Sequence, residues 1–153
     1  MIFLASAGFL GYAPVASGTF GTLAGIVLFL ALSLLPFWGY LAVLFVFLAL
    51  AVLISHRAEQ IFGGKDDGRI VIDEVAGYLV TMAGIRPGLT VIILGFLLFR
   101  AFDILKPWPV RFIDQKCPGG LGVVLDDVAA GIYSLAVLFV IIHFWPSLGA
   151  VCW

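Results

Sequence analysis

Residues 37–54 read FWGYLAVLFVFLALAVLI, an apolar run that contains no charged side chain and stops at Ser55-His56-Arg57. A helix that crosses the roughly 30 Å hydrocarbon core of a bilayer needs about 20 mostly apolar residues. The run does not alternate between apolar and polar residues, as a half-buried strand would. It therefore predicts a membrane helix, and it sets the class of the whole protein.

Four further apolar runs flank this one, at residues 20–35, 75–85, 89–105 and 128–145. The run at 75–85 is too short to cross a bilayer by itself. We therefore expect an all-α, polytopic integral membrane helical bundle with about five membrane segments, some of them short or re-entrant. Pro36 separates the first two runs, so residues 20–54 form either a hairpin or one kinked helix. The hairpin fits better, because a single helix would be about 50 Å long.

The composition agrees with this class. Hydrophobic residues make up 63% of the 153 residues and charged residues only 11%, whereas soluble domains average roughly 25% charged residues. So few charges cannot coat a small soluble globule, and a disordered chain has the opposite composition. The length allows one domain, residues 1–153, and the net charge of −1 gives no reason to expect nucleic-acid binding. Nothing in the sequence points to an obligate protein partner.

The five-segment arrangement sorts the basic residues by side. The first side, with the adjoining helix ends, contains Arg57, Lys65, Arg69, Arg100, Lys106, Arg111 and Lys116, and the other side contains only Arg86. Loops rich in Lys and Arg stay in the cytoplasm, so the first side is predicted to be cytoplasmic. Trp38, Tyr40, Trp145 and Trp153 then fall near the outer interface, where aromatic residues are enriched.

All nine carboxylates fall on the same, cytoplasmic half: Glu59, Asp66, Asp67, Asp73, Glu74, Asp103, Asp114, Asp126 and Asp127. Counted from the outer turns, Glu74 lies about 15 Å deep and Arg100 about 16 Å deep, so we expect the two to meet. A charge at membrane depth costs at least about 2.5–3.5 kcal/mol. Such charges persist where they pair, bind a metal ion or line a wet cavity, so the pattern favours a one-sided site.

The residue types in this cluster suit phosphate chemistry. Arg100, Asp103 and Lys106 are spaced three residues apart and share a helix face. Carboxylates are ligands for Mg²⁺, and Arg and Lys bind phosphate. Thr19 lies in the glycine-spaced segment SGTFGT at 17–22, which can offer amides and hydroxyls to an anion.

Structural explanations stay open for single members of the cluster. Asp73 and Asp126 could cap helices, Asp103 could form an ion pair with Arg100 or Lys106, and residues 17–22 could be a plain helix cap. A divalent-cation transporter with acidic intramembrane ligands is the alternative function. It would need polar residues that reach the outer side, and the sequence has almost none. A structural subunit would tolerate neutral replacement of Asp103 or Asp127.

Four blocks carry a resemblance to a known family: GTFGT at 18–22, IVIDEVAG at 70–77, FRAFDILKP at 99–107 and GGLGVVLDD at 119–127. In this order they resemble phosphatidylglycerophosphatase A, and the resemblance covers nearly the whole chain. It implies a Mg²⁺-dependent, multi-pass enzyme of the bacterial inner membrane with its site facing the cytoplasm. Such an enzyme converts phosphatidylglycerophosphate to phosphatidylglycerol and phosphate in phospholipid biosynthesis. Cys117 is not part of the family pattern.

This reaction gives the clustered residues predicted roles. The expected metal ligands are Glu74, Asp103, Asp126 and Asp127, and the expected phosphate-binding residues are Arg100, Lys106 and Thr19. Asp127, or otherwise Asp73, is predicted to accept the proton of an attacking water. Direct attack by an Asp carboxylate stays open, as does the choice between one metal ion and two.

Overall fold

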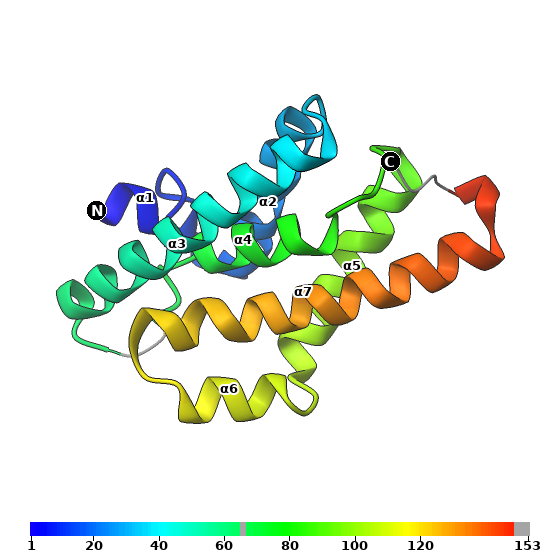
Figure 1. Cartoon of the computed structure of the whole chain (residues 1–153). Helices are drawn as coiled ribbons and strands as arrows, with labels where there is room; N and C mark the ends of the chain where they lie inside the picture. Colours follow the sequence, from blue (N-terminus) through cyan, green and yellow to red (C-terminus); the bar gives the residue numbers. More distant parts are fainter. Residues whose placement is uncertain (65–66, 149–153) are drawn as a thin grey trace.

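The computed structural model describes residues 1–64 and 67–148, in which helices are joined by turns and loops, without strands. The helices are α1 (Ile2–Ala5), α2 (Ser17–Leu32), α3 (Phe37–Phe62), α4 (Ile72–Thr81), α5 (Leu89–Leu105), α6 (Val110–Lys116) and α7 (Gly119–Phe144) (Figure 1). Short 3₁₀ turns lie at Leu10–Tyr12 and Pro146–Leu148. The all-α prediction is confirmed.

Helix α4 is the centre of the bundle. Helices α2, α3, α5 and α7 all pack against it, and every one of its residues except Glu74 is buried. Apart from the acids of its first turn, α4 is almost entirely apolar, which is the pattern of a helix enclosed on every side. Asp73 and Glu74 occupy the first turn, where negative charge complements the helix dipole. Gly84, with a φ of +81°, turns the chain after α4.

Glycines allow the neighbouring helices to approach α4 closely. A Cβ atom at Gly25 of α2 would lie 3.0 Å from the Cβ of Tyr78. A Cβ atom at Gly131 of α7 would lie 2.5 Å from the carbonyl oxygen of Gly77 on α4. Small residues at such crossings allow close contact between backbones in membrane helices. These contacts fix the position of α4 relative to α2 and α7. They thereby also position the acidic residues at the start of α4.

Residues 20–54 form two helices, as the hairpin interpretation predicted. The chain turns at residues 33–36, and Figure 1 shows α2 and α3 diverging from this turn. Helix α4 packs against both of them. The wedge between the two arms is therefore filled by the most buried helix of the protein.

Two helices extend beyond their apolar runs. Helix α3 continues from Ile54 to Phe62, and α7 begins at Gly119 rather than at Val128. Hydropathy marks the part of a helix that contacts lipid or the core, whereas backbone hydrogen bonding decides where the helix ends. The additional turns of α7 carry Asp126 and Asp127, which the sequence placed at a helix start and the structure places inside the helix.

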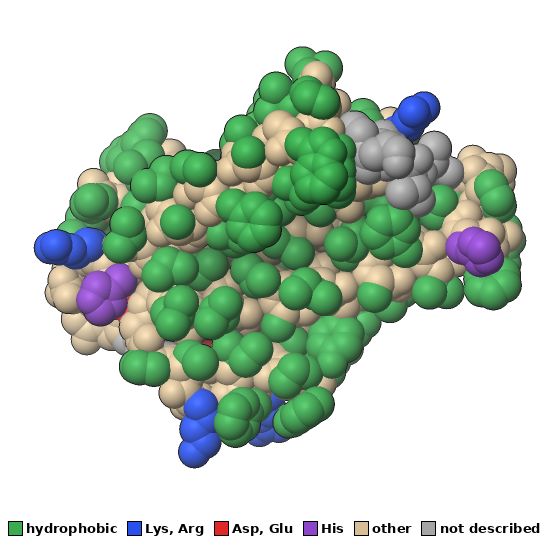
Figure 2. Space-filling view, in the orientation of Figure 1, with side chains coloured by type: hydrophobic (Ala, Val, Ile, Leu, Met, Phe, Trp, Pro, Cys, Tyr) green, Lys and Arg blue, Asp and Glu red, His purple; other side chains and the backbone are tan. Residues whose placement is uncertain are grey.

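The surface suits a bilayer. Helices α3 and α7 are long and apolar enough to cross it, and α2 is a shorter apolar helix. Helix α4 would be only about 15 Å long, so the number of membrane segments stays a prediction. Large apolar side chains such as Phe45, Leu53 and Val140 are exposed. Figure 2 shows hydrophobic side chains across most of one face, with Lys and Arg at its margins.

The side assignment also used residues outside the described part of the chain, namely Lys65, Asp66 and Trp153. Cys152 lies there too. Cys117 is a free thiol at the end of α6.

Candidate active site

A cavity of about 300 Å³ lies where α4 begins and α5 ends. The five carboxylates that the sequence singled out all line it: Asp73, Glu74, Asp103, Asp126 and Asp127. The rest of the wall consists of Ser17, Gly68, Ile70, Ile104 and Lys106. Four helices and one loop thus bring together residues that are far apart in the sequence.

Arg100 is not among the lining residues, but it holds two of the carboxylates that are. Its Nη1 donates hydrogen bonds to Glu74 Oε1 at 3.1 Å and to Asp103 Oδ2 at 2.6 Å. The three side chains are only 15–17% exposed, and charges with so little water need such partners. The expected meeting of Glu74 and Arg100 at one level is confirmed.

Two glycines of α2 make room for Glu74. A Cβ atom at Gly18 would collide with the Glu74 carboxylate and would lie 2.8 Å from Arg100 Nη1. A Cβ atom at Gly21 would also collide with that carboxylate. The glycine spacing of the 18–22 motif therefore brings the α2 backbone directly against the charged pair, and this explains the motif better than helix capping does.

Lys106 joins three helices at the cavity wall. Its Nζ donates to Asp126 Oδ2 on α7 at 2.7 Å and lies 3.3 Å from Asp114 Oδ2 on α6. Lys106 itself ends α5 in the left-handed conformation, with a φ of +42°. Residues other than glycine rarely adopt this conformation, and they do so where the surrounding contacts enforce it.

Asp127 presents a buried acceptor to the cavity. Its residue exposure is 3%, and its Oδ2 accepts no hydrogen bond within the described residues. An unsatisfied buried oxygen is costly, and it often marks a place where water or an ion completes a site. The α4–α7 crossing positions this residue, because a Cβ atom at Gly77 would lie 2.8 Å from the Asp127 carbonyl oxygen.

Contacts outside the cavity hold in place the loop between α3 and α4, which lines the cavity. Arg69 donates to both carboxylate oxygens of Asp67 at 2.7 Å, and its guanidinium lies 3.9 Å from the centre of the Phe62 ring. The hydrogen bonds from Arg69 hold the pKa of the Asp67 carboxyl below its usual range. The Val71 N–H donates to the Ala5 carbonyl at 2.9 Å. Both ends of the loop are thereby tied to other parts of the bundle.

The predicted phosphate-binding residues do not all reach the cavity. Lys106 lines it, Arg100 contacts two residues that line it, and Thr19 is not among the lining residues. Ser17, at the first position of α2, occupies the wall instead. The sequence analysis missed Ser17, because the motif alone does not reveal which of its hydroxyls points inward. The residue at which α2 begins decides which hydroxyl points inward, and the sequence did not show where α2 begins.

The donor set fits a hard divalent cation. Mg²⁺ takes oxygen ligands, keeps several waters and commonly binds through one or two carboxylates. The buried Asp127 oxygen and the carboxylates around it offer such ligands. No three Asp, Glu, His or Cys side chains of the described residues converge into a ready-made metal site, and Arg100 and Lys106 donate hydrogen bonds to Glu74, Asp103 and Asp126. The arrangement therefore suits a hydrated ion with few direct protein ligands.

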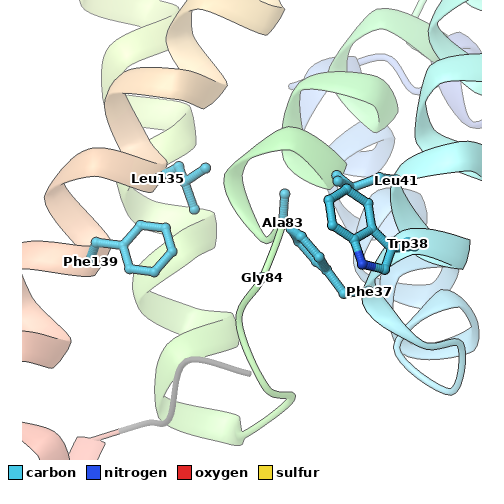
Figure 3. Close-up of a pocket in the computed structure, with 7 residues that line it drawn as sticks. All are labelled: Phe37, Trp38, Leu41, Ala83, Gly84, Leu135 and Phe139. Atoms are coloured by element: carbon cyan, nitrogen blue, oxygen red, sulfur yellow. The ribbon is translucent and has the colours of Figure 1, made fainter. Parts of the chain in front are cut away.

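A second cavity is larger, but its lining includes no acidic or basic side chain. It measures about 810 Å³, and its lining residues are Phe37, Trp38, Leu41, Ala83, Gly84, Leu135 and Phe139. Figure 3 shows these side chains of α3 and α7 on either side of the turn that follows α4. None of them titrates, so this larger cavity is not the candidate active site.

Comparison with known proteins agrees with the geometry. Residues 3–142 match the phosphatidylglycerophosphatase A family. The chain belongs to this family. The matched range includes every residue that lines the carboxylate cavity. Membership makes the chain an enzyme, a lipid phosphatase, as the resemblance of the four sequence blocks implied.

Relatives align over most of their length. A phosphatidylglycerophosphatase A of Escherichia coli strain K12 is 34% identical over 137 residues, which is 89% of this chain and 80% of that protein. The phosphatidylglycerophosphatase A of Haemophilus influenzae is 40% identical over 133 residues, 85% of this chain and 80% of that protein. A Bacteroides thetaiotaomicron relative, provisionally named a phosphatidylinositol-3-phosphatase, is 35% identical and covers 85% of this chain and 86% of its own length. No solved structure matches the chain.

Replacing Gly18 with Ala tests how closely the site depends on α2. The added methyl group would displace Glu74 and disturb its ion pair with Arg100. Misplacing a catalytic group by about 1 Å can cost about 10²-fold in rate, so we expect a loss of that order in phosphate release by the purified enzyme. Gly64→Ala is the matched control, because nothing lies within 4 Å of a Cβ atom there. Equal rates for both variants would show that the packing of Gly18 against Glu74 does not matter for activity.

Proposed function

We propose that this enzyme hydrolyses the terminal phosphomonoester of phosphatidylglycerophosphate, giving phosphatidylglycerol and phosphate, with Mg²⁺ and at the cytoplasmic face of the membrane. The observation that supports this most directly is one cavity that joins five carboxylates to Lys106, with Arg100 immediately behind them. The names of the Escherichia coli and Haemophilus influenzae relatives supply the lipid. The transporter alternative has no comparable observation in its favour.

The residues in and beside the cavity have separate proposed roles in hydrolysis. Lys106 and Ser17 line the wall and are placed to bind phosphate oxygens. Arg100 positions Glu74 and Asp103 through its two hydrogen bonds. Asp127 Oδ2 accepts the proton of a water whose oxygen attacks phosphorus, and the bond from phosphorus to the glycerol oxygen breaks. The proton that Asp127 has accepted then passes to the leaving glycerol oxygen, which restores the hydroxyl of the product and the carboxylate of Asp127.

The metal ion would be held by members of the set Glu74, Asp103, Asp126 and Asp127. When bound, Mg²⁺ supplies positive charge to the phosphoryl oxygens and lowers the pKa of bound water. Asp127 belongs to this set and has a buried oxygen without a hydrogen bond within the described residues, so its replacement should weaken both metal binding and proton transfer. Asp73, also buried in the wall, is the second candidate for the base.

The cytoplasmic orientation is supported by the charges around the cavity. Among the described basic residues, Arg69, Arg100 and Lys106 lie in or beside the cavity region, and only Arg86 belongs to the turn at the far end of α4. Basic residues favour the cytoplasmic side. A lipid whose headgroup enters the cavity would then belong to the inner leaflet.

Neutral substitutions in the cavity test the reaction. Purified enzyme in detergent, supplied with phosphatidylglycerophosphate, should release phosphate, and Asp127→Asn, Asp103→Asn and Arg100→Ala should each lower the rate by roughly 10²–10³-fold. Glu59→Gln on α3 removes a carboxylate outside the cavity and should leave the rate unchanged. The enzyme assignment fails if the wild type releases no phosphate, and the site assignment fails if all three cavity variants match it.

Metal removal tests the cofactor. Activity should disappear in excess chelator and return when Mg²⁺ is added beyond the chelator, while chelator already saturated with Mg²⁺ should have no effect. Asp127→Asn should need a higher Mg²⁺ concentration for half of its own maximal rate, since it lacks one of the proposed ligands. Full turnover by chelated, metal-free enzyme would rule out the metal requirement.

Cysteine labelling tests the orientation. In a background with Cys117→Ser and Cys152→Ser, a thiol introduced by Gly64→Cys should react with a membrane-impermeant maleimide only in inside-out vesicles. A thiol introduced by Arg86→Cys should react only in right-side-out vesicles. The reverse pattern would place the cavity at the outer face and leave the enzyme assignment intact.

A further inference from the structure

Helix α6 has two chemically different sides. Val110 is fully buried, and Asp114 faces inward, where its Oδ2 lies 3.3 Å from Lys106 Nζ. Arg111 and Lys116 are exposed, and neither forms an ion pair within the described residues. The acidic side chain of α6 therefore pairs with Lys106 inside the protein, whereas the two basic side chains of α6 face outward.

Large apolar side chains of the same segment are exposed as well. Leu105 is 75% exposed, Trp108 is 79% exposed and Phe112 is 55% exposed. Figure 2 shows Lys or Arg side chains beside hydrophobic ones over α6, at the lower edge of the view. Exposed aromatic and aliphatic groups beside unpaired cations are typical of protein segments that lie at a membrane–water interface.

This surface adjoins the mouth of the carboxylate cavity. Ile104 lines the cavity and is also 69% exposed, so it marks the opening, and the surface follows directly after it in the chain. The segment is held in place, since Tyr133 Oη of α7 donates to the Trp108 carbonyl at 3.0 Å. The Tyr133 ring also stacks on Phe102, with 5.6 Å between ring centres.

We propose that residues 104–116 form a docking surface for anionic phospholipid beside the cavity mouth. Leu105, Trp108 and Phe112 contact the acyl chains and the interface, and Arg111 and Lys116 contact the negative headgroups. Charge complementarity selects this partner, because the exposed charges of α6 are both positive and its single acid is turned away. An anionic surface attracts each nearby basic side chain measurably, whereas a zwitterionic one has little net charge.

The proposal goes beyond hydrolysis and does not depend on it. It assigns the protein a preference for the lipids around it, whatever phosphate ester enters the cavity. Anionic lipid would be enriched next to the opening from which the substrate enters and the product leaves. A lipid-binding measurement can therefore fail or succeed independently of any activity assay.

Fluorescence quenching by brominated lipid tests the surface directly. Replacing Trp38, Trp145 and Trp153 with Phe leaves Trp108 as the reporter. The protein is reconstituted into phosphatidylcholine vesicles in which the same minority fraction is either brominated phosphatidylglycerol or brominated phosphatidylcholine. We expect stronger quenching by the anionic lipid, corresponding to about two- to fivefold local enrichment, and we expect raised salt to reduce this preference.

Charge-neutral variants locate the preference. Arg111→Gln and Lys116→Gln should each reduce it, and the double variant should bring the two brominated lipids to equal quenching. Arg57→Gln, which removes an exposed basic side chain from α3, should leave it unchanged. Equal quenching of the wild type by the two lipids, or a preference that survives the double variant, would overturn the proposal. So would a Trp108 that neither lipid quenches, which would indicate that protein, such as a second copy of the chain, covers the surface.

Discussion

Glu74 carries its charge on a short helix that four other helices enclose, and Arg100 is the group that makes this tolerable. Removing a carboxylate from water costs several kcal/mol even in relaxed proteins. Helix α5 must therefore run to the depth of Glu74, so that Arg100 can bridge Glu74 and Asp103. Helix α2 must present glycine where it meets this pair. The packing of three helices thus follows from one buried ion-pair network.

Much of this arrangement could be predicted from the sequence, because membrane chains have few ways to hide a charge. Apolar runs located α2, α3, α4, α5 and α7. Counting from the turns placed Glu74 and Arg100 at one level, and the structure finds them paired. The five carboxylates of the predicted site share one cavity for the same reason. The depth of a residue in the bilayer depends mainly on its distance along the helix from the nearest turn, and this distance can be counted in the sequence.

The features that could not be predicted depend on how each helix is rotated about its axis and on where each side chain points, rather than on depth in the bilayer. Ser17 and Thr19 lie in one motif at nearly one level, yet only Ser17 faces the cavity. Asp126 and Asp127 are neighbours, yet they point in different directions, and it is the Oδ2 of Asp126 that accepts the hydrogen bond from Lys106. The left-handed backbone of Lys106, which joins α5, α6 and α7, depends on tertiary contacts that no local pattern records.

The charge balance of the cavity is a reason to expect that a cation accompanies the anionic substrate that we propose. Five carboxylates face two cations, so the group carries a formal excess of three negative charges when all are ionised. At an effective dielectric constant near 20, two like charges about 4 Å apart repel by about 4 kcal/mol. A phosphate monoester brings further negative charge into the same space, and Lys106 and Arg100 are already engaged with carboxylates. A divalent cation, which attracts carboxylate and phosphate oxygens alike, would offset a large part of this repulsion. That is the physical reason for expecting the lipid phosphate and the metal ion to bind this cavity together rather than separately.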